Sequence, residues 1–355
     1  MEQWLQDLTR QLGEEASAGL CIEPDPNPLD RSNFQVAGHG QPLSCDRRQL
    51  AARRWLDQHQ SHAATAGLAW PLQWSAPDPE VTIDPRSDEE LLQWLVDPQS
   101  AWLRQLGLHP AERVDPVEDL EALTLSSLLQ AQVLNQDLED HLLAAETPAW
   151  CETLAGQGVF PPAAGAQLEE GILSHRLQAL QLQLDRLGRC SRQGTQLMAG
   201  DIQVVVQPGR FTPRGLMRGW LQHLRLCADD AVFGGSAVIA RADKGDDAKT
   251  HVRWGRLEPA EAQAQLLTLQ RLAQQGQHQC WPVPPRSGWL LMSRDHNKAG
   301  SGVAAFKDSW ILERQDPQQR LCFGAEAEAH QLLQSQGFEQ ACALLYEPML
   351  QALAL

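Results

Sequence analysis

Apolar residues recur every three or four positions over much of this chain, which is the pattern of amphipathic helices. The clearest stripe consists of leucines and Ile172 within residues 166–188. The same spacing predicts helices over residues 1–16, 46–60, 88–107 with an interruption at Pro98, 120–146, 166–188, 216–228 and 258–275.

Strand patterns occur in the second half of the chain. The run "DIQVVV" (201–206) predicts a strand that leads into a turn over 207–215. Two further runs, 236–243 and 249–257, flank the turn sequence "KGDD" and predict a β-hairpin. Helix, strand, helix and hairpin in this order predict a mixed α/β (α+β) fold.

A Gly-, Pro- and Ala-rich stretch, "GQGVFPPAAGAQ", predicts a linker between two parts of the chain. Before it, Ser87 and the acidic residues that follow it suit a helix N-terminus, because they satisfy free backbone N–H groups. We therefore expect a loop-rich region over 1–86, an acidic helical unit over 87–155 and a mixed α/β domain over 161–355.

Charge is distributed unevenly behind the net charge of −16 for the 355 residues. Residues 1–160 hold 26 acidic and 9 basic residues, whereas residues 161–355 hold 19 acidic and 20 basic ones. The segment 186–256 is basic, with 12 basic against 6 acidic residues. Local basic charge is what contacts phosphates, so the acidic total does not exclude nucleic acid. The acidic helical half is expected to face protein partners.

The sequence lacks the common signatures of cofactor and metal chemistry. It has no G-x-x-x-x-G-K-[ST], no G-x-G-x-x-G after a strand, no H-E-x-x-H and no G-x-S-x-G. None of the eight cysteines forms a C-x-x-C pair, which favours reduced thiols. We expect no cofactor, no bound metal, no membrane span and a cytoplasmic location.

The segment "RFTPRGLMRGWLQHLRL" (210–226) carries apolar residues on one helix face and arginines on the other. Guanidinium groups can bind phosphate through two hydrogen bonds. We therefore expect a DNA-binding surface made of Arg210, Arg214, Arg218, Arg225 and Arg253, and Trp254 could stack on a base. The alternatives are a solvated helix face and, for Trp254, a place in the core.

Several titratable residues have plainer interpretations. His175 lies close to the apolar stripe of its helix and is expected to be a partly buried structural residue. The pairs Asp229–Asp230 and Asp246–Asp247 fall in expected turns, where carboxylates usually face water. A metal site there would need further ligands from elsewhere in the chain.

The second half contains, in order, "QPGRFTPRGLMRGWLQHLRLCA", "CWPVPPRSGW", "DPQQRLCFG" and "GFEQACALLYEPML". These segments resemble the C-terminal part of the RecC family, the gamma subunits of exodeoxyribonuclease V (RecBCD). Upstream, "LDRSNFQVAGHGQPLSCDRRQLAARRWL" and "DEELLQWLVDPQSAWLRQLGL" are similar to earlier segments of that family. The resemblance covers nearly the whole chain and rests on the order of the segments.

The resemblance implies a last domain with a degenerate PD-(D/E)xK nuclease-like fold. Active members carry G-x-x-x-H-x-x-x-E on a helix, G-x-[IV]-D on a strand and D-x-K on the next strand. This chain matches at Gly171, His175, Gly200 and Ile202. The acidic and lysine positions are occupied instead by Ala179, Gln203 and, beyond Gly209, Pro213, Gly215 and Met217. Because an amide cannot replace a carboxylate in a hydrolytic magnesium site, no catalytic residue is expected.

By the same resemblance, we expect a non-catalytic scaffold that guides DNA strands in a RecBCD-type complex during double-strand-break repair by homologous recombination. Its expected partners are RecB-like and RecD-like subunits and forked or single-stranded DNA. One alternative is a divergent magnesium-dependent nuclease of the same fold that uses Asp201, Asp229 or Asp230 with His175. Another is a protein adaptor without DNA contact.

Overall fold

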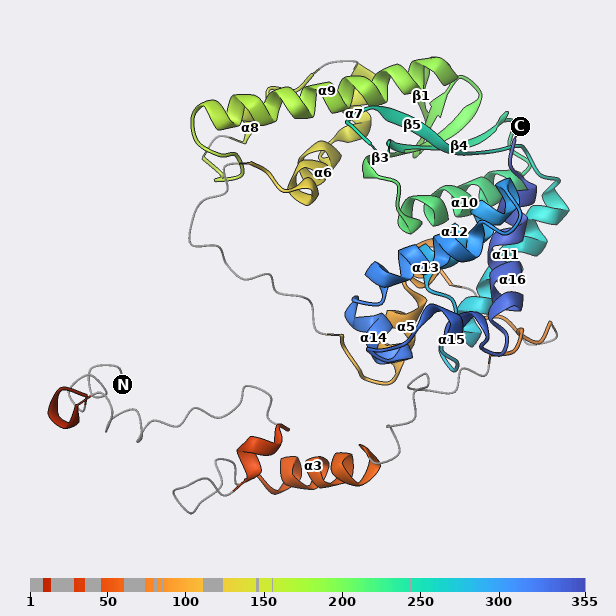
Figure 1. The fold of residues 1–355 in the computed structure, drawn as a ribbon. Helices are drawn as coiled ribbons and strands as arrows, with labels where there is room; N and C mark the ends of the chain where they lie inside the picture. The colour runs from red at the N-terminus through yellow and green to blue at the C-terminus, as the bar shows by residue number, and fades with distance from the viewer. Residues whose placement is uncertain are drawn as a thin grey trace. The chain divides into compact units, whose positions relative to one another are not determined.

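The computed structural model describes residues 9–13, 29–35, 46–60, 74–79, 82–84, 86–110, 124–144, 147–154, 156–242 and 244–354. Contacts divide the chain into two compact units, Met1–Gly67 and Leu68–Leu355. The first unit contains a 3₁₀-helix η1 (Arg31–Phe34) and the helix α3 (Arg47–Gln60). Figure 1 labels α3. The predicted helix over 46–60 is confirmed, and most of the one over 1–16 lies outside the described residues.

The second unit contains a five-stranded mixed sheet. Its strands follow the chain order in space: β1 (Cys190–Gln193), β2 (Gln196–Ala199), β3 (Ile202–Arg210), β4 (Gly235–Arg241) and β5 (Ala248–Trp254). β3 and β4 run parallel, and the other neighbours are antiparallel. The mixed α/β fold and the β4–β5 hairpin predicted from the sequence are therefore confirmed.

Helices cover both faces of this sheet (Figure 1). On one face lie α9 (Ala164–Leu187) and the shorter helices α6 (Ser127–Asn135), α7 (Leu138–Ala144) and α8 (Trp150–Thr153). On the other face lies α10 (Pro213–Ala228). Alternation along β3 explains the two layers, because Val204 joins the core under α9 and Val205 joins the core under α10.

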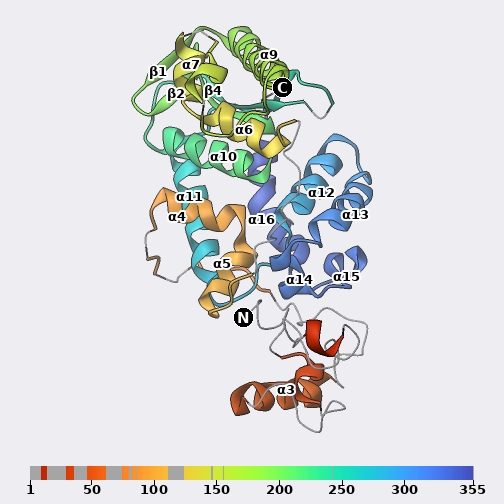
Figure 2. The ribbon, with the colours of Figure 1, turned by 90° about the vertical axis from the view of Figure 1, so that its left-hand side faces the viewer.

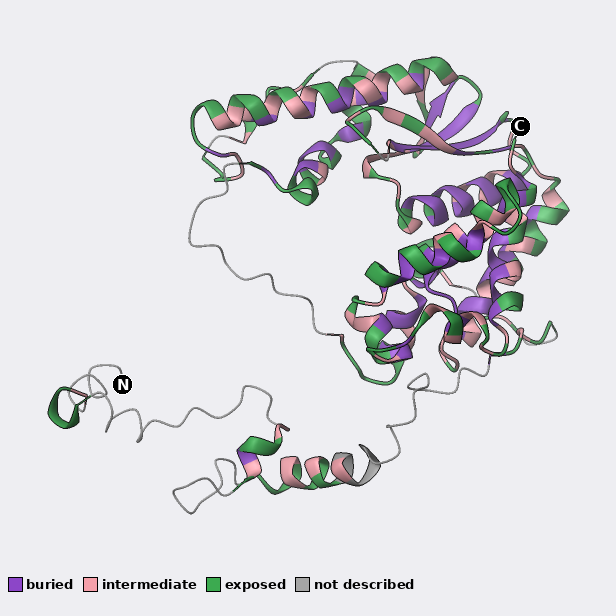
Figure 3. Ribbon diagram, in the orientation of Figure 1, coloured by how far each residue is buried: buried purple, intermediate pink, exposed green. Residues whose placement is uncertain are grey.

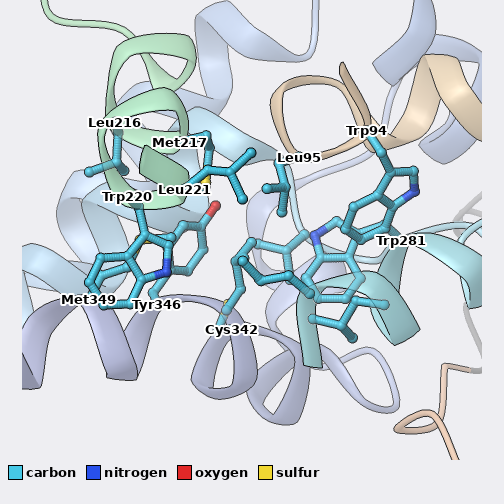
Figure 4. Packing of buried hydrophobic residues seen from close by; sticks show 14 of the residues in the cluster. Trp94, Leu95, Leu216, Met217, Trp220, Leu221, Trp281, Cys342, Tyr346 and Met349 are labelled. Carbon is cyan, nitrogen blue, oxygen red and sulfur yellow. The ribbon is translucent and has the colours of Figure 1, made fainter. Parts of the chain in front are cut away.

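The outer side of α10 packs on a helical layer (Figure 2). This layer contains α4 (Asp88–Val96), α5 (Pro98–Gln105), α11 (Pro259–Gln275), α12 (Pro285–Asn297), α13 (Gly302–Glu313), α14 (Pro317–Phe323), α15 (Ala329–Leu333) and α16 (Phe338–Gln351). Its core is aromatic: the Trp94 and Trp281 rings meet edge to face with centroids 5.5 Å apart (Figure 4). Burial is continuous from this core through α10 to the sheet (Figure 3).

Two sequence predictions are corrected by the structure, and one hairpin was not predicted. The helix predicted over 120–146 is two helices, α6 and α7, because the chain turns between them at Asp137, which has a φ of 51°. The turn predicted over 207–215 instead continues β3 to Arg210 and begins α10 at Pro213. The β1–β2 hairpin was not predicted; its turn contains Gly194, at a φ of 61° that suits glycine.

Helices on both sides of the predicted domain boundaries share cores. α4, before the predicted linker, packs against α10 and α11, whereas α6 and α7 pack against α9. The boundaries at residues 86, 155 and 161 stay predictions. Within the region 87–155, α4 belongs to the same core as α10 and α11, and α6 and α7 belong to the same core as α9. Among the described residues, no helix is long and apolar enough to cross a membrane.

Candidate functional site

A groove of about 740 Å³ lies where α6, the end of β3 and the start of α10 meet. Four arginines line it: Arg210 from the end of β3, Arg214 and Arg218 from the first turns of α10, and Arg241 from the end of β4. Its remaining walls are mostly small, amide or apolar residues of α6 and β3. The groove therefore gathers three of the arginines predicted from the sequence.

The parallel pairing of β3 and β4 explains why these arginines converge. Arg210 and Arg241 are register partners at the ends of the two strands. The chain then turns into α10 at Thr212, whose backbone N–H and hydroxyl both bind the side-chain amide of Gln207, at 3.2 and 2.8 Å. Thr212 also caps the helix by accepting a hydrogen bond from Gly215 N. This short connection holds Arg214 and Arg218 beside the strand ends.

The groove has a strongly positive lining. No acidic residue is among the described residues that line it. Within the described chain, Arg210, Arg214 and Arg218 make no ion pair within 4.0 Å. The N-terminus of α10 adds the positive end of a helix dipole at the same place. Such a surface suits an anion with several oxygens, such as a phosphate chain.

Arg241, in the groove lining, belongs to a partly buried polar network. Its guanidinium lies 3.6 Å from Asp246, which accepts a 2.7 Å hydrogen bond from Arg176 on α9. Burial, together with the charges of Arg176 and Arg210, lowers the pKa of Arg241, and Asp246 opposes this shift. Arg241 Nε is buried without a hydrogen-bond partner. The positive charge here therefore exceeds the local negative charge.

The same network continues into α6. Arg176 donates a 2.7 Å hydrogen bond to Gln130, which in turn donates one of 2.8 Å to the buried Glu169 on α9. Glu169 also accepts the backbone N–H of Leu125, just before α6. These bonds connect α9 to α6, which forms one wall of the groove, and to the β4–β5 turn.

Three of the predicted site residues lie outside the groove. Arg225, at the other end of α10, forms a bidentate ion pair with Asp88 of α4. Arg253 is exposed on β5 and is not part of the groove lining. Trp254 is 0 % exposed and donates a 2.9 Å hydrogen bond to the backbone oxygen of Met349. The stacking hypothesis for Trp254 is therefore wrong, and the alternative of a core residue is correct.

The positions matched to nuclease motifs are not arranged around a common point. Gln203 is buried between β3 and α10, where its amide donates a 2.7 Å hydrogen bond to Gln222. Asp201 precedes the strand and is exposed beside Gly234. Pro213, Gly215 and Met217 lie on α10, so the stretch compared with D-x-K is a helix and not the next strand. That next strand, β4, carries no Asp, Glu or Lys.

Two interpretations of titratable residues need correction. His175 is exposed on α9 and not partly buried. Asp246 is half-buried and binds Arg176, whereas Asp229, Asp230 and Asp247 are exposed as expected, and Asp230 also pairs with Arg256. Among the described residues, no group of three or more His, Cys, Asp or Glu side chains is arranged to hold a metal ion.

Sequence reasoning had included Arg241 only within the basic segment 186–256, and it predicted the helical region that contains α6 without assigning it to the site. The signal for Arg241 was available: two parallel strands joined by a helix end at the same edge of a sheet. No pattern in α6 indicates that Gln132 and Asn135 would line a groove with residues some 75 positions later.

Comparison with known proteins gives a family. The model described as the RecC C-terminal domain matches residues 85–296, which include α4–α11, the whole sheet and the arginine groove. No curated protein matches the chain. The match spans more than half of the sequence.

Proposed function

This chain belongs to the RecC C-terminal domain family, and on that premise we propose that it is a non-catalytic, DNA-guiding part of a RecBCD-type exodeoxyribonuclease V in the cytoplasm. The family itself indicates a role in that complex, and thus in DNA repair and recombination. The finer assignment is that the arginine groove holds a DNA strand while other surfaces bind RecB-like and RecD-like subunits.

The observation that carries this proposal is the groove. Four arginines from three elements line a groove that no described acidic residue lines. A DNA strand presents phosphates in a row, and each phosphate can accept bidentate hydrogen bonds from a guanidinium. The apolar and amide residues of α6 and β3 give the sugar and base edges a neutral wall. Of the residues expected to bind DNA, we retain Arg210, Arg214 and Arg218, add Arg241, and treat Arg253 as a separate contact.

A non-catalytic role is supported by the lost carboxylates. The buried amide of Gln203 binds Gln222 and offers no charged oxygen to a divalent ion. We propose that the helix α9 followed by the sheet is a degenerate PD-(D/E)xK fold, in which Gly171 and His175 precede Gly200 and Ile202. The rival nuclease would need Asp201, Asp229 or Asp230 to act with His175, which lies on a helix on the opposite face of the sheet from α10.

The DNA proposal is tested with the triple variant Arg210→Gln, Arg214→Gln, Arg218→Gln. Fluorescence anisotropy with forked and single-stranded DNA should show a loss of affinity of roughly tenfold or more, because a hydrogen bond to a charged group contributes about 1.5–3 kcal/mol. The matched control is Arg294→Gln, which changes an exposed arginine of α12 outside the groove. Equal affinity of the triple variant and the wild type would overturn the groove assignment.

Catalysis and partners are tested separately. A nuclease assay with magnesium and with manganese should show no DNA cleavage by this chain. Cleavage that disappears in Asp201→Ala would overturn the non-catalytic role. Co-purification with a RecB-like helicase tests the scaffold role, and failure to co-purify would favour a function outside the complex.

A further inference from the structure

The outer face of the long helix α9 is almost free of charge. Between Glu170 and Asp185 the sequence holds a single Lys, Arg, Asp or Glu, namely Arg176, and that side chain is buried. On the outer side, by contrast, Leu168 and Leu182 are 71 % and 62 % exposed, and Figure 3 shows exposure along this side of the helix. Charged residues are depleted in the centre of protein interfaces, so this face has the composition of one.

The residues of this face are arranged symmetrically about His175. Gly171 and Ala179 are the fourth residues before and after it, and Leu168 and Leu182 are the seventh. Residues three, four and seven positions apart share one face of a helix, so all five lie together. A single exposed leucine needs no explanation, but this order reads nearly the same in both chain directions. Two copies of α9 can therefore pair antiparallel, with each leucine opposite the other leucine of the second copy.

The charges at the two ends of α9 also suit an antiparallel pair. At its C-terminal end the exposed Arg186 and Arg189 outnumber the exposed Asp185. At its N-terminal end lie the half-exposed Glu170 and, on the adjoining helix α8, the exposed Glu152. An antiparallel pair places the basic end of each copy beside the acidic end of the other, which is favourable. A parallel pair would place like charges together, so the charges select the antiparallel direction.

The surface around α9 is shaped for a second helix. Gln178 and Leu182 line two hollows, one on each side, and so form a ridge between them. The hollow towards the start of β5 has a volume of about 370 Å³, and the hollow towards α7 has a volume of about 280 Å³. Leu142 and Leu184 give the smaller hollow an apolar lining. Helices pack by fitting ridges into grooves, so a leucine of a second α9 has an apolar place beside Leu182.

We propose that the outer face of α9 binds the same face of a second copy of this chain, as an antiparallel helix pair with a two-fold axis at His175. In this register Leu168 of one copy contacts Leu182 of the other, and the two-fold axis makes that contact twice. Gly171 lies opposite Ala179, and these small residues let the two helices approach closely. No described residue of α9 lines the arginine groove, so the dimer presents two separate grooves. This inference goes beyond the DNA role and does not depend on it.

Self-association of the full chain is measured by sedimentation velocity at about 1–300 µM protein. We expect a reversible dimer with a dissociation constant of about 1–100 µM, because one helix pair buries less surface than a standard interface. Leu168→Glu and Leu182→Lys should each weaken dimerisation roughly tenfold or more, since each buries a charge against a leucine in two symmetric contacts. The matched control Val232→Glu changes an apolar residue that is 96 % exposed outside α9, and it should leave dimerisation unchanged.

A mixture of the two leucine variants tests the register of the helix pair. If position 168 of one copy faces position 182 of the other, a dimer of Leu168→Glu with Leu182→Lys brings the introduced carboxylate and ammonium groups together. Its second contact keeps the original two leucines. With a fluorescent label on one variant, the mixture should therefore associate several-fold more tightly than either variant alone. Such recovery also shows that both variants are folded.

Three results would overturn the proposal. The first is a wild-type chain that remains monomeric at about 300 µM. The second is a dimer that both leucine variants form as tightly as the wild type, because the contact would then lie on another surface. The third is a mixture that associates no more tightly than its components, which would exclude the antiparallel register. Both leucine variants should bind forked DNA like the wild type, so a failure of this proposal is distinguishable from a failure of the DNA role.

Discussion

On α10, the Nδ1 atom of the His223 imidazole lies 2.9 Å from the hydroxyl oxygen of Ser236 on β4. The ring is 0 % exposed, and its other nitrogen is 3.6 Å from the Cys227 sulfur. It packs between Trp220 and Trp254, with ring centroids 5.5 and 5.8 Å away. Burial lowers the pKa of His223 to about 4, although a backbone hydrogen bond with Gly255 opposes the shift. The folded protein thus keeps this histidine neutral in the layer that joins α10 to the sheet.

This relationship predicts a loss of stability in mild acid. The unfolded chain protonates His223 near its ordinary pKa of 6.5, whereas the folded chain does so near 4, so the unfolded state binds more protons between these values. The contribution to stability is complete above pH 6.5 and is lost as pH falls towards 4, amounting to about 3 kcal/mol. Urea unfolding followed by tryptophan fluorescence at about pH 7.5 and about pH 4.5 measures it.

The variant His223→Gln isolates this effect from the protonation of carboxylates, which wild type and variant share. The variant should be less stable at neutral pH and should lose less stability on acidification. His278→Gln, at an exposed position, is the matched control. Parallel pH profiles for wild type and His223→Gln would show that the buried imidazole is not responsible.

Gly219 sets how closely α10 can approach the sheet. A Cβ at this position would lie 2.6 Å from Val238 Cγ2 and 3.2 Å from the Trp254 ring. We expect Gly219→Ala to lower the free energy of unfolding by about 1 kcal/mol or more, because overpacking outweighs the better helix propensity of alanine. Gly171→Ala is the control, since its Cβ would meet nothing within 4 Å on α9. That variant should be stabilised by up to about 1 kcal/mol, and equal stabilisation of both would refute the packing argument.

Much of this fold follows from local patterns in the sequence. The leucine stripe of α9, the arginine-bearing helix α10 and the β4–β5 hairpin all have strong local signals, and each was predicted to within a few residues. The break between α6 and α7 was not predictable, because it depends on Asp137 adopting a positive φ that non-glycine residues rarely adopt. Likewise, the four-residue strands β1 and β2 are too short to show a period.

The candidate site was predictable only in part. Helical spacing placed Arg214 and Arg218 on one face, and the turn placed Arg210 beside them. The same spacing included Arg225, but its ion pair with Asp88 depends on the tertiary contact between α10 and α4. Trp254 next to Arg253 was ambiguous because alternate residues of a strand face opposite sides, and only the packing of α10 and α16 decides which side is buried.

The turn between β4 and β5 offers a comparison of two adjacent aspartates. Asp246 accepts a 2.7 Å hydrogen bond from the largely buried Arg176, whereas Asp247 is exposed. We expect Asp246→Asn to lower the free energy of unfolding by about 1–2 kcal/mol, because it leaves Arg176 and Arg241 without their carboxylate. Asp247→Asn should change it by less than about 0.5 kcal/mol. Equal effects in chemical denaturation would show that Asp246 does not support the network behind the groove.

The salt dependence of DNA binding tests whether the groove arginines contact phosphates at all. Each phosphate contact on single-stranded DNA contributes about 0.7 to the slope of log affinity against log salt. The variant with Arg210, Arg214 and Arg218 changed to glutamine should therefore lose about 2 from that slope between about 50 and 200 mM salt. If Arg253 only borders the DNA path, Arg253→Gln should reduce the slope by less than about 0.7, the value of one phosphate contact. An unchanged slope in the triple variant, with affinity reduced, would mean that these arginines act through folding and not through phosphate binding.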